Sequence, residues 1–268
     1  NPAAAFAYVT TAPKELVSNA RGQSAVTAEW IKSDPRAAQD AVLALNNQGV
    51  RYYTGFTAVS LLANTDLDAA IEFSARYENR AGDGSHPAVG SLASKIIEER
   101  GVGGIQAWLN EVDVGQATTS YKSEAIEHLG YWHTGPDMAA ILAAPENRSF
   151  VTSELLRDIA GSAVSKESDR LGKGLDWLAN LPPEVGPQRQ AIGERFEKYL
   201  KQDFEAAGEW LVNQELTPAH DGALEIFVRN ATMDDLPASM QWAKQISDPT
   251  LRAKTIQFVR ERGGQDSE

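Results

Sequence analysis

The apolar residues near the end of this chain recur at the spacing of two consecutive amphipathic helices. In residues 235–246 they lie three and four positions apart, at Leu236, Met240, Ala243 and Ile246. This spacing predicts a helix. Ser247-Asp248-Pro249 then supplies a capping acceptor and a proline suited to the first helical position. A second helix is therefore expected over residues 250–262, ended by Gly263-Gly264.

This two-helix pattern recurs along the chain, and a large ring marks the first helix of each copy. The rings are Trp30, Phe73, Trp108, Trp177, Trp210 and Trp242. The gaps between them are 43, 35, 69, 33 and 32 residues. The gap of 69 spans two copies, because a degenerate copy lies around residues 137–142. About seven copies of roughly 35 residues result, which is the length of a helical hairpin repeat.

The predicted second helices carry their own rings, which are Phe196, Phe227 and Phe258 at intervals of 31 residues. One hairpin cannot cover such rings on both sides, whereas stacked hairpins bury them between neighbouring copies. We therefore expect the repeated rings to be core residues and not platforms on which a ligand stacks.

A basic residue recurs just after the turn between the two helices of a copy. The recurring residues are Arg36, Arg189, Arg252 and, less regularly, Arg148. A cation in the first turn of a helix opposes the helix dipole, so a compensating partner is expected. The favoured partner is a carboxylate on the adjoining helix or copy, and the alternative is contact with a ligand.

The repeated elements include Ala207-x-x-Trp210, Asp248-Pro249-x-x-Arg252 and Phe-Val-Arg at 227–229 and 258–260. With them the chain resembles the α/α helical-hairpin solenoids, the tetratricopeptide and HEAT-like class, over residues 15–262. No copy shows the tetratricopeptide consensus, so the resemblance is to an architecture. It implies an all-α, right-handed α/α solenoid of about seven helical hairpins, whose concave surface commonly holds a protein or peptide. Residues 1–14 are then an N-terminal extension, and residues 263–268 a disordered C-terminal tail.

The net charge of the chain limits the classes of molecule that it is expected to bind. It has 25 basic and 37 acidic residues, for a net charge of −12. This charge repels nucleic acid and anionic membranes, and it favours a basic or neutral protein or peptide partner. No apolar stretch is long enough to insert into a membrane. The small residues at 3–7 suit the start of a mature exported protein, so a periplasmic or secreted location is weakly preferred.

The pattern breaks between residues 79 and 147, where function is expected because a broken repeat frees surface from packing. Residues 79–87 predict a long turn, and 101–104 a glycine-rich bend. The candidate binding residues in this region are Tyr121, His128, Tyr131, Trp132 and His133. Their rings could stack on a sugar or on a peptide side chain. Alternatively, Tyr131 and Trp132 fill the space left by the missing repeat tryptophan. A second aromatic cluster at 51–56 places Tyr52 and Phe56 on one helix face, which favours a core role.

No catalytic, metal or cofactor motif is evident. The absence of cysteine removes disulfides, thiolate metal ligands and thiol nucleophiles. The spacing from His128 to His133 fits no standard zinc site, and no phosphate-binding loop or nucleophile elbow is present. The leading hypothesis is a non-catalytic protein- or peptide-binding scaffold. The alternatives are a carbohydrate-active α/α toroid using paired carboxylates and a glycan-binding solenoid.

Overall fold

The computed structural model describes residues 1–11, 20–81, 86, 88–133, 135–164, 169–232 and 235–265. This part of the chain contains 15 α-helices and no strand, which confirms the predicted all-α class. The chain divides into two compact units, Asn1–Leu129 and Gly130–Glu268. The division falls inside one helix, α7 (Thr118–Trp132). Each unit is described by itself below.

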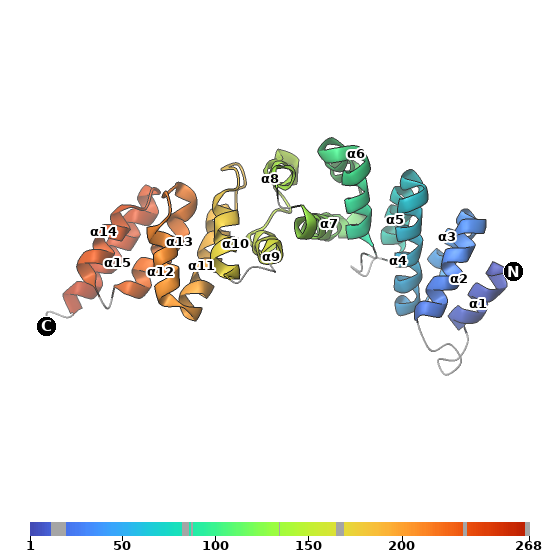
Figure 1. The fold of residues 1–268 in the computed structure, drawn as a ribbon, viewed down its shortest axis with the longest axis horizontal. Coiled ribbons are helices and arrows are strands. Elements are labelled where there is room, and N and C mark those ends of the chain that lie inside the picture. The colour runs from blue at the N-terminus through green and yellow to red at the C-terminus, as the bar shows by residue number, and fades with distance from the viewer. Residues whose placement is uncertain are drawn as a thin grey trace. The chain divides into compact units, whose positions relative to one another are not determined.

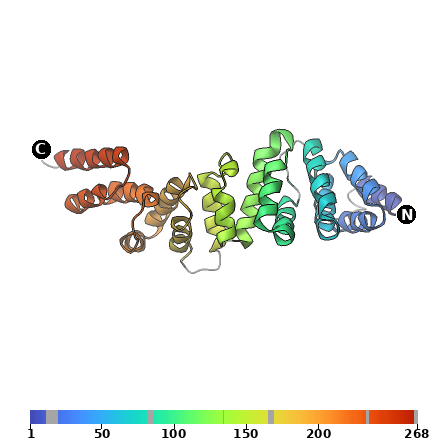
Figure 2. The ribbon, with the colours of Figure 1, turned by 90° about the horizontal axis from the view of Figure 1, so that it is seen from above.

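The helices of the first unit begin at the N-terminus and lead into α7. They are α1 (Pro2–Thr11), α2 (Ala20–Ser33), α3 (Pro35–Ala44), α4 (Gln48–Thr65), α5 (Leu67–Ala81) and α6 (Val89–Glu111), with a 3₁₀ turn at Gly115–Ala117 before α7. Helix α4 packs against α2, α3, α5 and α6, so helices contact both their neighbour and the helix after it. Figures 1 and 2 show α2 to α5 side by side within this unit.

The second unit continues with helices of similar length. They are α8 (Pro136–Ala143), α9 (Ser153–Ala163), α10 (Arg170–Ala179), α11 (Gln188–Gln202), α12 (Phe204–Val212), α13 (Asp221–Ala231), α14 (Leu236–Lys244) and α15 (Pro249–Gln265), with 3₁₀ turns at Pro145–Asn147 and Pro218–His220. Helix α11 contacts α9, α10, α12 and α13, and α13 contacts α14 and α15. The same neighbour-and-next packing therefore holds within this unit.

At three places, two consecutive helices are joined by a single aspartate, which we call an aspartate corner. The corners are Asp34, Asp66 and Asp203. Their backbone angles agree closely, with φ between −152° and −154° and ψ between 83° and 96°. Each corner N–H donates to the helix before it at 2.7–2.8 Å. Each carboxylate accepts an N–H of the helix after it at 3.0–3.1 Å. One residue thus ends one helix and caps the next.

The large rings lie where the repeat pattern predicts them, because none of the six first-helix rings is exposed. Phe73, Trp108 and Trp210 are buried, and the other three are half-buried. In the second unit the Phe196 ring lies 5.7 Å from Trp210 and 6.4 Å from Phe227. Phe227 in turn lies 5.6 Å from Trp242. Phe196 and Phe227 therefore each contact the indole of the ring-bearing helix that follows them in the chain.

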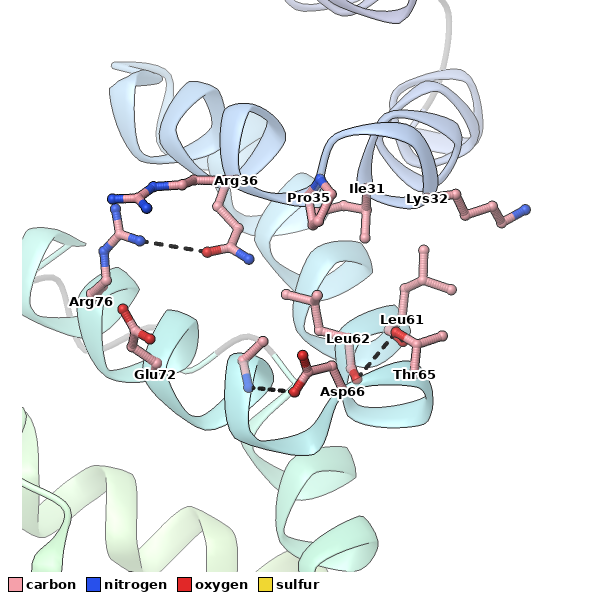
Figure 3. Close-up of a pocket in the computed structure, with 12 residues that line it drawn as sticks. Ile31, Lys32, Pro35, Arg36, Leu61, Leu62, Thr65, Asp66, Glu72 and Arg76 are labelled. Atoms are coloured by element: carbon pink, nitrogen blue, oxygen red, sulfur yellow. Dashed lines mark hydrogen bonds between the residues drawn. The ribbon is translucent and has the colours of Figure 1, made fainter.

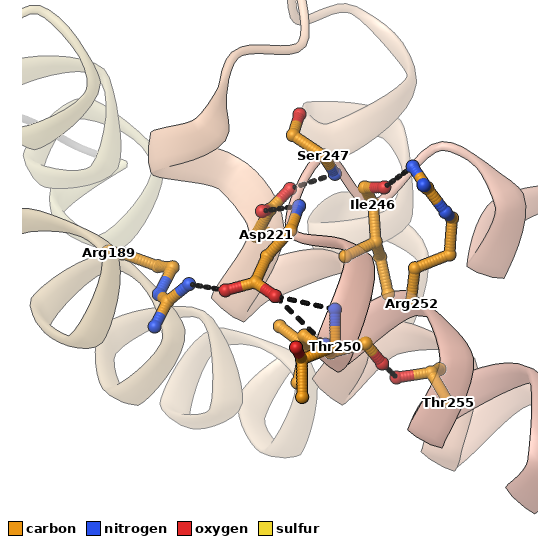
Figure 4. A network of polar contacts seen from close by, with 9 residues as sticks. Arg189, Asp221, Ile246, Ser247, Thr250, Arg252 and Thr255 are labelled. Atoms are coloured by element: carbon orange, nitrogen blue, oxygen red, sulfur yellow. Dashed lines mark hydrogen bonds and ion pairs between the residues drawn. The ribbon is translucent and has the colours of Figure 1, made fainter.

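A polar network ties α11, α13 and the α14–α15 turn together (Figure 4). Arg189 Nη1 lies 2.9 Å from Asp248 Oδ2, so Arg189 has the carboxylate partner predicted for it. The backbone N–H of Leu251 and the Arg189 guanidinium hold the pKa of the Asp248 carboxyl below its usual value. The Asp221 carboxylate, itself buried, accepts the backbone N–H groups of Ser247 at 2.8 Å and Asp248 at 2.9 Å.

Arg252 differs from the prediction, because its partner is a backbone carbonyl. Its Nη1 donates to the Ile246 oxygen at 2.9 Å. Arg51 does the same in the first unit, donating to the Leu45 oxygen at 3.1 Å. Both bonds satisfy a carbonyl in the turn before the helix, where intrahelical partners are missing. A carbonyl dipole thus replaces the expected carboxylate.

Four local predictions need correction. Helix α15 continues through Gly263-Gly264 to Gln265, so these glycines do not end it, and residues 266–268 lie outside the described residues. Helix α5 runs to Ala81, which shortens the turn expected at 79–87. At the bend expected over 101–104 only Gly101 leaves helical geometry, with φ 66° and ψ −169°, a conformation open to glycine alone. Tyr52 and Phe56 are exposed on α4 and are not core residues.

Candidate functional site

A pocket of about 540 Å³ lies in the first unit, between the aspartate corners Asp34 and Asp66. Helices α2, α3, α4 and α5 each contribute side chains to it. Its lining includes Pro35, which follows the first corner, and Asp66, which is the second corner. Figure 3 shows the side chains that line it.

One part of the pocket wall is apolar. Ile31, at the end of α2, and Leu62, near the end of α4, are buried and form its floor with Leu61 and Pro35. These positions are held by the close contact of α2 with α4. Such a surface can receive an aliphatic or aromatic side chain, since burial of apolar area is the main source of affinity in pockets of this kind.

The other end of the pocket is cationic. Figure 3 shows the guanidinium groups of Arg36, from α3, and Arg76, from α5, pointing toward one another. Arg76 Nη2 pairs with Asp40 Oδ1 at 2.6 Å, and its Nη1 lies 3.5 Å from Gln39 Oε1. Arg36 makes no hydrogen bond or ion pair within the described part of the chain, so the carboxylate predicted for it is not found there. An exposed guanidinium of this kind can bind a ligand carboxylate with two hydrogen bonds.

Carboxylates near the pocket are already used or turned to solvent. The Asp66 carboxylate accepts the Ala69 N–H as a helix cap, and Glu72 is exposed at the rim. The lining therefore combines three cations, Lys32, Arg36 and Arg76, with these two carboxylates. Lys32 pairs with Glu29 at 2.7 Å and Arg76 pairs with Asp40 at 2.6 Å, so Arg36 is the lining cation left without a carboxylate partner among the described residues.

Of the five residues predicted from the broken repeat, Tyr121 lies in the core of the first unit. Tyr121 is fully buried, its hydroxyl lies 2.6 Å from Ser74 Oγ, and its ring lies 5.8 Å from Trp108. Burial raises the pKa of the Tyr121 phenol. A ring in the core cannot stack on a ligand at the surface, so the structure places Tyr121 among the packing residues.

The other four candidates follow Tyr121 on α7 or just after it. His128 is half-buried and its ring lies against Gly90 of α6, and this burial lowers its pKa. Tyr131 is 52% exposed, and His133 is half-buried. The side chain of Trp132 lies outside the described residues. Tyr131 and His133 belong to the second unit, whereas Tyr121 and His128 belong to the first.

The contact of His128 with Gly90 gives a testable prediction. A Cβ atom at Gly90 would lie 2.2 Å from His128 Cγ. Gly90→Ala is therefore expected to destabilise the protein by about 1–3 kcal/mol, the usual cost of overpacking. Gly103→Ala on the same helix is the control, because nothing lies within 4 Å of its Cβ position. Thermal unfolding followed by circular dichroism should show a lower Tm for the first variant alone. Equal Tm values would contradict this packing.

The described part of the chain offers no group of three or more histidine, aspartate or glutamate residues that could hold a metal ion. None of its helices is long and apolar enough to cross a membrane. No protein-family model matches the sequence, and neither a curated protein nor a solved structure matches it. Function is therefore inferred from the residues of the chain itself.

The sequence does not predict the pocket, although it contains one residue that points to a ligand, Arg36. Arg36 is expected in the first turn of a helix, where a cation needs a compensating partner. That partner is either a carboxylate of the chain or a ligand. Arg76 carried no such signal, because it lies 40 residues further along and meets Arg36 only through the packing of α3 against α5.

Proposed function

We propose that this protein is a helical-repeat scaffold, a right-handed α/α solenoid of about seven hairpins, that binds a segment of a protein or peptide. Two features support the architecture: the period of roughly 35 residues and the neighbour-and-next packing within each unit. Binding through the pocket involves no chemistry, and the scaffold holds its partner by shape and charge.

The pocket between α2 and α5 is the proposed binding site, and the single observation that carries this proposal is Arg36. Its guanidinium faces the pocket with no partner among the described residues. A ligand carboxylate at Arg36 and Arg76 would supply the missing anion. An apolar side chain one position away would fill the floor at Ile31 and Leu62. The preferred segment thus has an acidic residue beside a large apolar one.

The charge of the whole chain indicates which charge the partner carries outside the bound segment. A net charge of −12 favours basic or neutral surroundings for that segment, because long-range attraction accelerates association. The acidic residue is therefore a local feature of the bound segment. The partner as a whole is basic or neutral.

Selection of random short peptides displayed on phage, with the full chain immobilised, tests this proposal. We expect enrichment of peptides in which an acidic residue adjoins a large apolar residue. Arg36→Glu should weaken binding of a selected peptide by about tenfold or more, because it sets a carboxylate against a carboxylate. Arg148→Glu is the control, since Arg148 is an exposed arginine of the second unit. Enriched peptides that bind equally well to both variants would exclude the pocket as the binding site.

A further inference from the structure

Away from the pocket, one histidine joins a carboxylate and a hydroxyl in the first unit. His86 Nδ1 lies 2.8 Å from Glu78 Oε2, and His86 Nε2 lies 3.0 Å from Ser120 Oγ. The side chains of His86 and Glu78 are almost entirely buried, whereas Ser120 is exposed. A buried base is thus hydrogen-bonded to a serine that solvent can reach.

The orientation of the His86 ring is fixed by helices α5 and α7. Glu78 holds one ring nitrogen from α5, and Tyr121 of α7 meets the ring edge-on at 5.5 Å and 90°. Tyr121 is itself held by its 2.6 Å hydrogen bond with Ser74 of α5. Ser120 lies in the first turn of α7. His86 itself lies between α5 and α6, outside any helix, and its ring is oriented by Glu78 and Tyr121, which are on helices.

These bonds assign a role to each ring nitrogen. In the neutral tautomer of His86 that carries its hydrogen on Nδ1, Glu78 Oε2 accepts that hydrogen, and the lone pair of Nε2 faces the serine hydroxyl. The Ser120 hydroxyl can donate its hydrogen either to His86 Nε2 or to the Ala117 carbonyl oxygen, also at 3.0 Å. Rotation of the hydroxyl hydrogen from Ala117 to His86 readies the serine for attack. A base within hydrogen-bond reach of a hydroxyl, and oriented by a third group, is the signature of an activated nucleophile.

The geometry points to a second activity for this protein, in which Ser120 hydrolyses small esters through a covalent acyl intermediate. Ser120 Oγ bonds to the ester carbonyl carbon while its proton passes to His86 Nε2. The bond to the leaving alkoxide breaks, and His86 gives that proton to the alkoxide, so an alcohol departs. Water then attacks the acyl-serine and gives a proton to His86. The ester bond to Ser120 breaks, Oγ takes the proton back, and a carboxylic acid departs.

Ser120 lies in no sequence motif for a nucleophile, so the sequence alone gave no reason to single it out. His86 precedes it by 34 residues, and Glu78 precedes His86 by 8. Only the packing of α5 and α7 around His86 brings the three together. This activity uses different residues from the pocket and does not depend on peptide binding.

An alkyl fluorophosphonate tests the nucleophile directly. Attack by Ser120 Oγ on phosphorus forms an O–P bond, fluoride leaves, and the serine proton passes to His86. We expect a single adduct on Ser120, located by mass spectrometry of peptides from the labelled full chain. Ser120→Ala should remove the adduct and lower hydrolysis of p-nitrophenyl acetate by about 100-fold or more, the lower range for assistance by a general base. Because Ser120 is exposed and alanine suits a helix, this variant should keep its fold and its Tm.

Two further variants complete the test. Thr119→Ala removes the neighbouring exposed hydroxyl on the same helix and should change neither labelling nor hydrolysis. His86→Ala should abolish both, and added imidazole should restore part of the labelling at Ser120. The proposal is overturned if the wild-type chain is not labelled, if the adduct lies on another residue, or if Ser120→Ala hydrolyses the ester as fast as the wild type.

Discussion

Replacing Phe196 by alanine is expected to lower the free energy of unfolding by about 3–5 kcal/mol, the usual cost of removing a buried aromatic ring. Phe196 has no exposed surface, and its ring contacts both Trp210 and Phe227. Removing it would leave a cavity where the Phe196 ring of α11 contacts Trp210 of α12 and Phe227 of α13. The loss is large because helices on both sides are rigidly packed and can fill the cavity only in part.

Denaturant unfolding of the full chain, followed by circular dichroism and tryptophan fluorescence, measures this loss. Phe204→Ala is the matched control, because Phe204 also contacts Phe227, at 6.0 Å, but is 48% exposed. Its replacement should cost about 0.5–1.5 kcal/mol, the value of a ring contact without deep burial. Phe196→Leu should fall between the two. An equal decrease in the free energy of unfolding for Phe196→Ala and Phe204→Ala would contradict a role for the Phe196 ring in holding α11 against α12 and α13.

Asp221→Ala is expected to have the second-largest effect, a loss of about 2–4 kcal/mol in the free energy of unfolding. The Asp221 carboxylate accepts two backbone N–H groups of the α14–α15 turn, from Ser247 and Asp248, and it is buried. Alanine would leave both donors without this acceptor, and the loss of a hydrogen bond to a charged group costs roughly 1.5–3 kcal/mol where water cannot fully replace it. The position of Asp248, and with it the ion pair to Arg189, would also be lost.

The control for Asp221 is an exposed carboxylate in the same unit. Glu197 pairs with Lys201 at 2.6 Å, but both side chains are largely exposed. Glu197→Gln should therefore change stability by about 0.5 kcal/mol or less. Thermal and urea unfolding of the wild type, Asp221→Ala and Glu197→Gln measure the two changes in stability. A loss for Asp221→Ala no larger than that for Glu197→Gln would contradict the bridging role of Asp221.

The sequence predicted the helical class and the ring packing well, because both follow from side-chain periodicity. The structure buries or half-buries each of the six rings that mark the predicted first helices. The aspartate corners could also have been found. Asp66 and Asp203 begin two segments that align in sequence, and an aspartate just before an apolar helical stretch is a common helix cap.

The sites were much harder to predict, because they depend on which faces meet. Tyr121 looked like a contact residue among other aromatic residues, yet it faces the core and orients His86. Tyr52 and Phe56 looked like core residues by helical spacing, yet the face of α4 that they share is exposed. The helical period shows which residues share one face of a helix. It does not show whether that face points to the core or to solvent. Residues such as Arg36 and Arg76 come together only once the helices are packed.

The aspartate corners also restrict where the length of this chain can vary. Because one residue links two helices, an insertion at Asp34, Asp66 or Asp203 would rotate the following helix by about 100° per added residue. Its apolar face would then turn to solvent. The segments at 112–117 and 180–187 join helices through several residues and can absorb such a change locally. Among natural variants of this protein, insertions and deletions should accumulate in these longer links and spare the corners.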